Sequence, residues 1–525
     1  MVSFETIENL LILAKNVHIY LLNVSFCRTF ALANSKLLEE MKKFLLIGAT
    51  ALMVSNSTFA GGILTNTNQN ATFLRNPARN AAIAIDGVYN NPAGIAFLPQ
   101  GFHLSVSWQA AIQKRLMEVN NNLFQMNANN QSTSREFVGK TNAPVIPSFQ
   151  AAYVINDKWS VSAQFAVGGG GGACEFAEGL PMFEELIGGI VYKNGGTSYA
   201  LNQNLTGEQY FYGFQVGATY KLTDNFSVFG GARGVLANCS YTGAIANIKA
   251  NGMNAAEYSA LSQQAAEGAQ KAAAAAQQYA AAGMAAEAAQ YAAAAEQYKA
   301  AAVQAGTVAA LIGDYKLDCA QSGFGITPII GLDWNLGKLN LAAKYEFRTK
   351  IELENESKNS DNLAMLATSV PAVAVYADGA KVRSDIPALL TFGAQYQIVD
   401  NFRAMAGGVY YWDKDAKGSP IKKGDNTWEA NFGVEWDVTD KLMLSCGAQR
   451  TQYGFDDADM ADTNFNTSSY AVAIGGAYKF SEKMKLNVGY MHSFYDDHKF
   501  TNANGTACNY TRKNDAVGVS LDITF

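Results

Sequence analysis

Three basic residues, Arg233, Lys344 and Arg348, lie on rows of alternate residues that face the less apolar side of their segments. Side chains two residues apart on a strand point to the same face, so all three are expected to face one interior. An arginine in partly dry surroundings binds a carboxylate through two parallel hydrogen bonds. The pattern predicts a site for an anionic head group. Glu346 and Glu352 share the same row, and ordinary ion pairing with them is the alternative.

A segment without alternation carries an apolar set that is costly to expose to water unless it packs or binds something. The set consists of Phe176, Leu180, Pro181, Met182, Phe183, Leu186 and Ile187. We predict contacts with a hydrophobic ligand for Phe176, Leu180, Met182, Phe183, Leu186 and Ile187. Packing of the same side chains against neighbouring structure is the alternative.

Five consecutive glycines stand just before this set: Gly168, Gly169, Gly170, Gly171 and Gly172. Glycine weakens a strand and lets it bend. The run predicts a kink that opens the wall of a sheet, and flexibility without an opening is the alternative.

Residue types for catalysis are sparse. Beyond residue 60 the chain has three histidines, His103, His492 and His498, and a hydrolase needs a nucleophile held against a base. Ser105 and Ser107 follow His103 on the same inward row, as expected by chance in a polar row. The stretch HSFYDDH from His492 is read as a solvated rim, with a divalent-cation site as the alternative. No enzyme activity, cofactor or metal is predicted.

The elements that position these residues are strands. From Gly101 to Phe525 the chain alternates in segments of about ten residues, for example Trp428 to Val438, where one side is apolar and the other polar. Fourteen such segments can be counted, approximately 101–116, 144–155, 158–168, 209–221, 226–244, 316–335, 339–354, 382–398, 402–416, 426–438, 441–453, 469–480, 483–498 and 511–525. Short turns alternate with long connections along the series. An even number of strands with this asymmetry is typical of an outer-membrane barrel.

Backbone hydrogen bonding gives the physical reason for closure. Hydrocarbon offers no partner for a free N–H or C=O, so a sheet persists there only without an edge. Aromatic residues cluster near the short turns, as in an interfacial girdle: Trp159, Tyr220, Trp334, Tyr396, Trp436, Tyr478 and Phe480. The last strand ends on Phe525, which predicts recognition by the barrel-insertion machinery, in addition to contact with outer-membrane lipid.

Export is predicted from an internal signal. Residues 41–60 combine Lys42 and Lys43, an apolar core and a small-residue cleavage site before Gly61. Residues 1–40 are then a doubtful extension that reflects an upstream start codon, with a real amphipathic extension as the alternative. A net charge of −6 offers no basic stripe, so nucleic acid is excluded as a partner.

Two segments lack the alternation. Residues 61–100 contain two Asn-Pro-Ala units and are predicted to form a plug in the lumen of the 101–525 barrel, with Asn91, Pro92 and Ala93 setting its geometry. Residues 255–311 are rich in alanine and predict a helical insertion in an extracellular loop. Cys239 and Cys319 flank that insertion, and whether they are bridged is open.

These features together resemble the FadL-type outer-membrane transporters of long-chain fatty acids and other hydrophobic compounds. The resemblance rests on NNPAGIAFL in the plug, VGGGGGACEFAEGLPMFEELI, LNLAAKYEFRTKIELE, SDIPALLTFGAQYQI and the terminal phenylalanine. It implies an all-β, fourteen-stranded barrel in the outer membrane of a Gram-negative bacterium. It also implies passive uptake: an extracellular loop captures a fatty acid-like small molecule, which exits sideways through the barrel wall.

The resemblance further implies that Ile63 and Leu64 reach into the ligand pocket, with a disordered terminus as the alternative. The alanine-rich insertion departs from the family pattern and leaves the shape of the entrance in doubt. A surface binding or adhesion barrel that works through this insertion is the second function class, and a non-selective porin is a weaker third.

Overall fold

The computed structural model describes residues 69–369 and 371–525. Its strands form one closed antiparallel sheet in which β1 pairs with both β2 and β17. The strands are β1 (Gly101–Asn120), β2 (Ser134–Val154), β3 (Trp159–Phe176), β4 (Tyr199–Thr223), β5 (Phe226–Ala250), β6 (Tyr315–Asn335), β7 (Leu339–Glu346), β8 (Glu352–Ser357), β9 (Lys381–Arg383), β10 (Leu389–Val399), β11 (Phe402–Tyr411), β12 (Trp428–Asp437), β13 (Leu442–Gln452), β14 (Ser469–Ser481), β15 (Met484–Tyr495), β16 (His498–Thr501) and β17 (Ala507–Thr524).

The seventeen strands occupy fourteen strand positions around the barrel, because β7 with β8, β9 with β10 and β15 with β16 each share one position with an interruption. The prediction of fourteen strands is therefore confirmed, but three of the predicted segments are not continuous. The segment predicted at 339–354 breaks at 347–351, where Phe347 and Thr349 instead bond to Pro328 and Ile386. A further correction concerns length: β2 and β4 begin ten residues earlier than predicted, at Ser134 and Tyr199.

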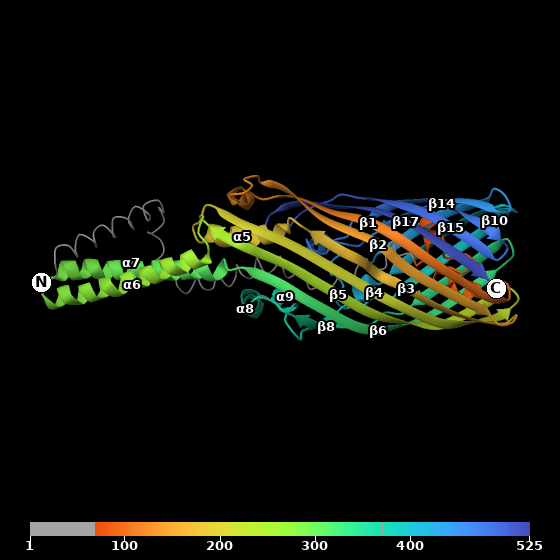
Figure 1. Ribbon diagram of the computed structural model, residues 1–525, viewed down its shortest axis with the longest axis horizontal. Coiled ribbons are helices and arrows are strands. Elements are labelled where there is room, and N and C mark those ends of the chain that lie inside the picture. The colour runs from red at the N-terminus through yellow and green to blue at the C-terminus, as the bar shows by residue number, and fades with distance from the viewer. Residues whose placement is uncertain (1–68, 370) are drawn as a thin grey trace.

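Alternation gives the barrel an apolar outside and a polar inside. On β12, Trp428, Phe432 and Trp436 are exposed on the outer wall, whereas Glu429 and Glu435 are buried within. The short turns lie at the end that holds the C-terminus, and the long connections lie at the opposite end (Figure 1). We call these the short-turn end and the long-loop end. Within the described residues, no helix combines the length and hydropathy needed to cross a bilayer.

Three short helices fill the lumen ahead of β1: α3 (Ala71–Arg75), α4 (Gly87–Asn90) and η1 (Pro92–Phe97). Asn70 caps α3 by accepting a hydrogen bond from the Thr72 N–H, and Asn91 caps η1 in the same way through the Gly94 N–H. Pro92 occupies the first position of η1, where a missing N–H costs nothing. Asparagine side chains thus cap two helices in a segment that is too short to form a hydrophobic core of its own.

The long connections carry the remaining helices: η2 (Asn122–Met126), α5 (Pro181–Lys193), α6 (Ala255–Ala281), α7 (Ala285–Leu311), α8 (Asp361–Ser369), α9 (Pro371–Ala374), η3 (Asp413–Asp415) and η4 (Asp457–Asp459). Helices α6 and α7 form an antiparallel hairpin that projects beyond the long-loop end (Figure 1). Each has 27 residues, about 40 Å of helix. Gly283 makes the turn with a φ of 76°, and the Tyr279 and Tyr291 rings stack beside it.

The predicted extension at 1–40, the signal at 41–60, and Ile63 and Leu64 lie outside the described residues.

Candidate functional site: the plugged lumen and its wall

A buried ion cluster fixes the plug to the barrel wall. The Glu435 carboxylate on β12 lies 2.6 Å from Arg75, 2.8 Å from Arg79 and 2.7 Å from Arg403. Arg79 also binds Asp86 through two hydrogen bonds of 2.8 Å. One wall carboxylate therefore receives three guanidinium groups, two of them from the plug.

The motif Asn91-Pro92-Ala93 forms a second attachment. The Asn91 amide donates to the Asp333 carboxylate, and the Pro92 and Ala93 carbonyls accept hydrogen bonds from the hydroxyls of Thr219 and Ser227. All three motif residues are buried. The geometry supports the structural role that the sequence predicts for them.

The predicted luminal cations come together around one carboxylate. Arg233 binds Glu346 through two hydrogen bonds of 2.7 and 3.1 Å, and the Lys344 amine lies 2.8 Å from the same side chain. The Tyr89 ring of the plug covers both cations, with the Lys344 amine 4.0 Å from its centre. Here the alternative of ordinary ion pairing describes the observed contacts.

Arg348 lies apart from that cluster. Its guanidinium is 3.6 Å from the Asp385 carboxylate, and about a third of its side chain is exposed.

Sequence reasoning missed a pair of arginines at the long-loop end. Arg115 on β1 lies directly opposite Arg512 on β17. The Arg115 guanidinium lies over the Phe465 ring, and that of Arg512 over the Tyr495 ring, at 5.4 and 5.0 Å. Both stand on period-two rows, which is the signal that identifies them as inward-facing.

The barrel wall is interrupted between β2 and β3. The strands pair at Gly139–Thr141 and again from Ser148, but residues 142–147 of β2 and 167–173 of β3 make no ladder pairs with each other. Pro144 and Pro147 contribute no N–H on one side. On the other side the predicted glycine run bulges twice against β4, and Gly170 has a φ of 72°. We call this interruption the wall gap.

A row of aromatic rings lies on the outer wall beside the wall gap. Phe149, Phe165, Tyr212 and Tyr210 follow one another with ring centres 6.5, 6.3 and 5.6 Å apart. Tyr210 and Tyr212 lie opposite Gly170 and Val167 in the β3–β4 ladder. The outer surface beside the wall gap is therefore aromatic.

The apolar loop predicted to capture a ligand forms α5 and the turn before it. Leu180, Met182 and Phe176 pack into a cluster with barrel aromatics such as Phe465 and Tyr510. Ile187 packs on the opposite side with Tyr258 and Val308 at the base of the helical hairpin. Phe183 and Leu186 are partly buried at the borders of these clusters. In this structure the alternative, packing of these side chains against neighbouring structure, describes the observed contacts.

Two adjacent glutamates near the start of α5 bind different parts of the barrel. Glu184 accepts hydrogen bonds from Asn127, Tyr199 and Gln203 and pairs with Arg135. Glu185 accepts from Asn502, Asn504 and Thr506. Sequence reasoning missed both, because their partners lie in distant parts of the sequence.

Asp462, in the connection after β13, caps α5 by accepting the Met182 N–H at 2.7 Å, and the Tyr510 hydroxyl also donates to it. Burial and the nearby charge of Glu185 raise the pKa of Asp462 from its ordinary 3.8 to about 6. A raised pKa means that docked α5 favours the protonated carboxyl. The docked state is therefore most stable below pH 4 and loses stability as the pH rises through 6.

We expect the protection of α5 amides from hydrogen exchange, corrected for intrinsic rates, to fall about tenfold between pH 5 and pH 7.5, on the order of 1 kcal/mol. Asp462→Asn keeps an acceptor for the Met182 N–H without a titrating group, so its protection should vary little with pH. Equal pH dependence in the two proteins would show that Asp462 does not control the docking of α5.

The five cysteines of the described residues are free, including Cys239 and Cys319. Cys319 lies opposite Tyr241, two residues from Cys239, so the two cysteines are diagonal neighbours on β5 and β6.

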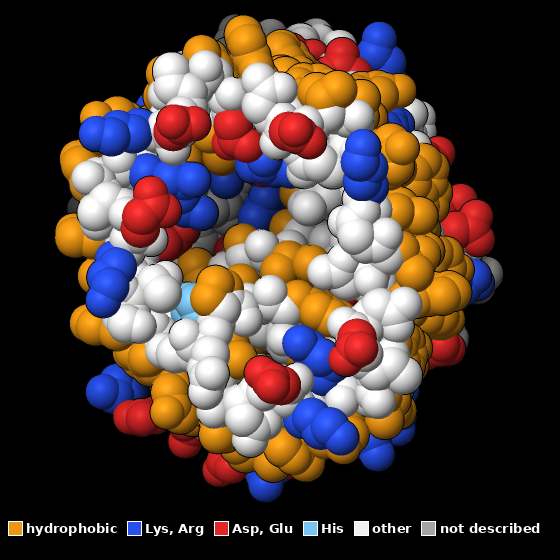
Figure 2. All heavy atoms as spheres, turned by 90° about the vertical axis from the view of Figure 1, so that its right-hand side faces the viewer, with side chains coloured by type: hydrophobic (Ala, Val, Ile, Leu, Met, Phe, Trp, Pro, Cys, Tyr) orange, Lys and Arg blue, Asp and Glu red, His pale blue; other side chains and the backbone are white. Residues whose placement is uncertain are grey.

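Seen from the short-turn end, the molecule is hollowed (Figure 2). Lys and Arg side chains are visible inside the hollow, and Asp and Glu side chains stand around it. The plug therefore leaves a charged vestibule at this end.

No known family model and no curated protein matches the chain. Among solved structures, a FadL homologue of Pseudomonas aeruginosa matches with a TM-score of 0.56 and 14% identity, over 89% of this chain and all of that one. A mutant of TodX, described as a monoaromatic hydrocarbon channel, matches with a TM-score of 0.52 and 14% identity, over 87% of this chain and 99% of that one. At this identity the likeness concerns the fold. The predicted resemblance is confirmed at that level: the chain has the closed fourteen-stranded barrel fold of the FadL-type transporters.

Proposed function

We propose that this chain is a channel of the Gram-negative outer membrane for passive uptake of hydrophobic compounds such as long-chain fatty acids, with sideways release into the membrane. The observation that carries the proposal is the contrast between the two possible exits. The axial path is filled by a plug whose arginines bind a buried wall carboxylate, whereas the side wall lacks ladder pairs over six residues of β2.

The fold supports the same function, because the compared structures are described as a FadL homologue and a hydrocarbon channel. In this proposal the long-loop end faces outward, and α5 with Phe176, Leu180, Met182, Phe183, Leu186 and Ile187 forms the entrance. The Phe525 N–H bonds to the Phe102 carbonyl, and the Phe525 ring remains exposed at the short-turn end. There it is accessible to insertion machinery before the barrel closes.

Arg233 and Lys344 take a holding role in this proposal, since both already pair with Glu346 beneath Tyr89. Among the predicted luminal cations, Arg348 has the greater exposure and is the candidate for transient ligand contact. Ile63 and Leu64 remain candidates for the inner pocket by resemblance alone.

The test is accumulation of radiolabelled oleate by a Gram-negative host that lacks its own transporter of this fold. Cells with the inserted barrel should accumulate oleate at least tenfold faster than cells with an empty vector. The purified barrel should pass little ionic current, because its lumen is plugged. Absence of uptake with the barrel inserted would refute the proposal, and a large steady conductance would favour a porin.

The projecting hairpin favours adhesion as a second candidate, and a truncation separates the two. Ser262 bonds to the Ala302 carbonyl across the hairpin, so replacement of residues 266–298 by a short glycine-rich turn shortens both helices by similar lengths. The base residues Tyr258 and Val308, which pack near α5, are retained. Uptake should stay within twofold of wild type. Unchanged uptake with loss of cell-surface binding would assign adhesion to the hairpin, whereas loss of uptake would assign the hairpin to the entrance.

A further inference from the structure

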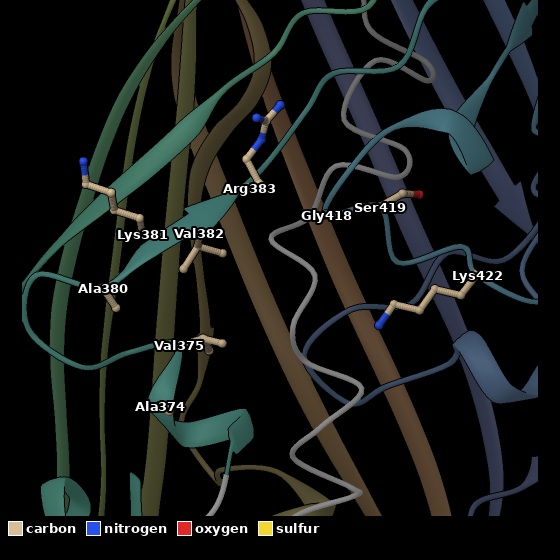
Figure 3. Close-up of a pocket in the computed structure, with 9 residues that line it drawn as sticks. All are labelled: Ala374, Val375, Ala380, Lys381, Val382, Arg383, Gly418, Ser419 and Lys422. Carbon is tan, nitrogen blue, oxygen red and sulfur yellow. The ribbon is translucent and has the colours of Figure 1, made fainter. Parts of the chain in front are cut away.

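A pocket of about 430 Å³ lies at the long-loop end, between the connection that carries α9 and the connection after β11 (Figure 3). It is lined by Ala374, Val375, Ala380, Lys381, Val382, Arg383, Gly418, Ser419 and Lys422. Its volume lies in the range of small-molecule sites. The pocket is separate from the Arg233, Lys344 and Glu346 cluster beneath the plug.

One wall of the pocket is apolar and preformed. Val382 pairs with buried Leu353 in the β8–β9 ladder, so the strand holds its side chain in place. Val375 and Val382 point toward the side on which Gly418 and Lys422 lie in Figure 3. Gly418 closes one side of the pocket through a close backbone approach: its φ is 81°, and an added Cβ would stand 1.9 Å from the Arg383 carbonyl oxygen.

The three cations of the pocket differ in their partners. Lys381 lies 3.8 and 3.7 Å from Glu352 and Glu354, and Arg383 pairs with Asp385. Lys422 forms no ion pair with any residue in 69–369 or 371–525. In Figure 3 Lys381 points away from the pocket, and the Lys422 amine points across it toward the valines.

The backbone around Lys422 is fixed. The N–H groups of Lys422, Lys423 and Gly424 donate to the Asp459 carboxylate at 2.8 to 3.2 Å. Asp459 is thereby used as an acceptor for main-chain groups, and the base of the Lys422 side chain is held in position. The Lys422 amine, on a fixed backbone, therefore faces the apolar wall of Val375 and Val382 across the pocket.

We propose that this pocket binds an amphiphilic anion, with the acidic head group against the Lys422 amine and the first carbons of the chain on Val375 and Val382. The inference rests on the proposed function and narrows it: the entrance favours ionised amphiphiles over neutral hydrocarbons of the same length. The ammonium group supplies a charge-assisted hydrogen bond that a neutral head group does not receive at equal strength.

The test compares radiolabelled oleate with oleyl alcohol, the neutral probe of equal chain length, by equilibrium binding to the full chain in lipid nanodiscs. Lys422→Gln should weaken oleate binding roughly fivefold and leave oleyl alcohol unchanged. Lys422→Arg should retain most of the oleate affinity. Lys423→Gln is the matched control, because Lys423 is adjacent to Lys422 in sequence and exposed but does not line the pocket.

An equal loss of oleate binding in the Lys422→Gln and Lys423→Gln proteins would overturn the inference, because it would show a diffuse charge effect. So would an equal loss for both probes in Lys422→Gln. Uptake by cells reports the proposed function separately. Wild-type uptake together with unchanged oleate binding in Lys422→Gln would reject the pocket and leave the channel standing. Absence of uptake together with Lys422-dependent binding would reject the channel and leave the pocket standing.

Discussion

A disulfide that joins β2 to β3 across the wall gap should reduce oleate uptake at least tenfold, and reduction of that disulfide should restore uptake. Ala143→Cys with Gly172→Cys provides the bond, because a Cβ added at Gly172 would lie 3.2 Å from the Ala143 Cβ. Disulfide-bonded residues have Cβ atoms about 3.5–4.5 Å apart, so only a small shift is needed. The bond fixes both edges of the gap, so the opening cannot widen to pass a ligand.

Cys174→Ser serves as the background, since Cys174 is close enough to Gly172 in sequence to compete for the new thiol. The matched control is Val434→Cys in the same background. Val434 lies directly opposite the native Cys446 in the β12–β13 ladder, far from the gap in strand order. Rapid uptake by a fully oxidised 143–172 protein would show that release does not pass between β2 and β3.

Removal of the charge on Glu435 should loosen the plug and raise ionic conductance several-fold above wild type. In Glu435→Gln, Arg75, Arg79 and Arg403 would stay close together without the carboxylate that balances them. Removing one partner of a buried ion pair costs about 3–5 kcal/mol, because the other charge is left without compensation. The plug segment has few other strong attachments to β12 and β13, so the cost should appear as displacement of α3.

Single-channel recording of the purified barrel measures this effect, and entry of a large polar antibiotic into cells gives a second readout. Asp437→Asn is the matched control on the same strand. It contacts Arg403 alone of the three arginines, and about a third of its side chain is exposed. A Glu435→Gln channel with wild-type conductance would indicate that the other attachments, such as those of Asn70 and Asn91, retain the plug.

The strands could be predicted from the sequence in the part of the barrel where one face of each strand contacts lipid. Near the short turns the predicted and observed boundaries agree closely, as at 339 for β7 and 402 for β11, because every second residue there must be apolar. Beyond the apolar belt both faces meet water or packed loops. The constraint on alternate residues disappears, and the first ten residues of β2 and β4 went unpredicted for that reason.

The site could be predicted only in part, because its contacts join distant segments. Period two identified Arg233, Lys344 and Glu346 as inward-facing, but the covering Tyr89 comes from the plug. Glu435 and Arg75 are 360 residues apart, and no local feature of either segment predicts their contact. The glycine run was a visible signal of an irregular wall. The matching signal on β2, the two prolines at 144 and 147, was present in the sequence but lay at the edge of a predicted strand.

The charged vestibule behind the plug affects how a hydrophobic ligand of the proposed channel partitions between the bilayer and the aqueous space. Moving the roughly sixteen methylenes of an oleate-length chain from a bilayer into such a watery chamber costs ~13 kcal/mol at about 0.8 kcal/mol for each methylene. In the proposed channel, a ligand at the wall gap would therefore partition into lipid and would not enter the aqueous space beneath. Net uptake of ligand by the proposed passive channel then continues only while a later step removes the ligand from the membrane.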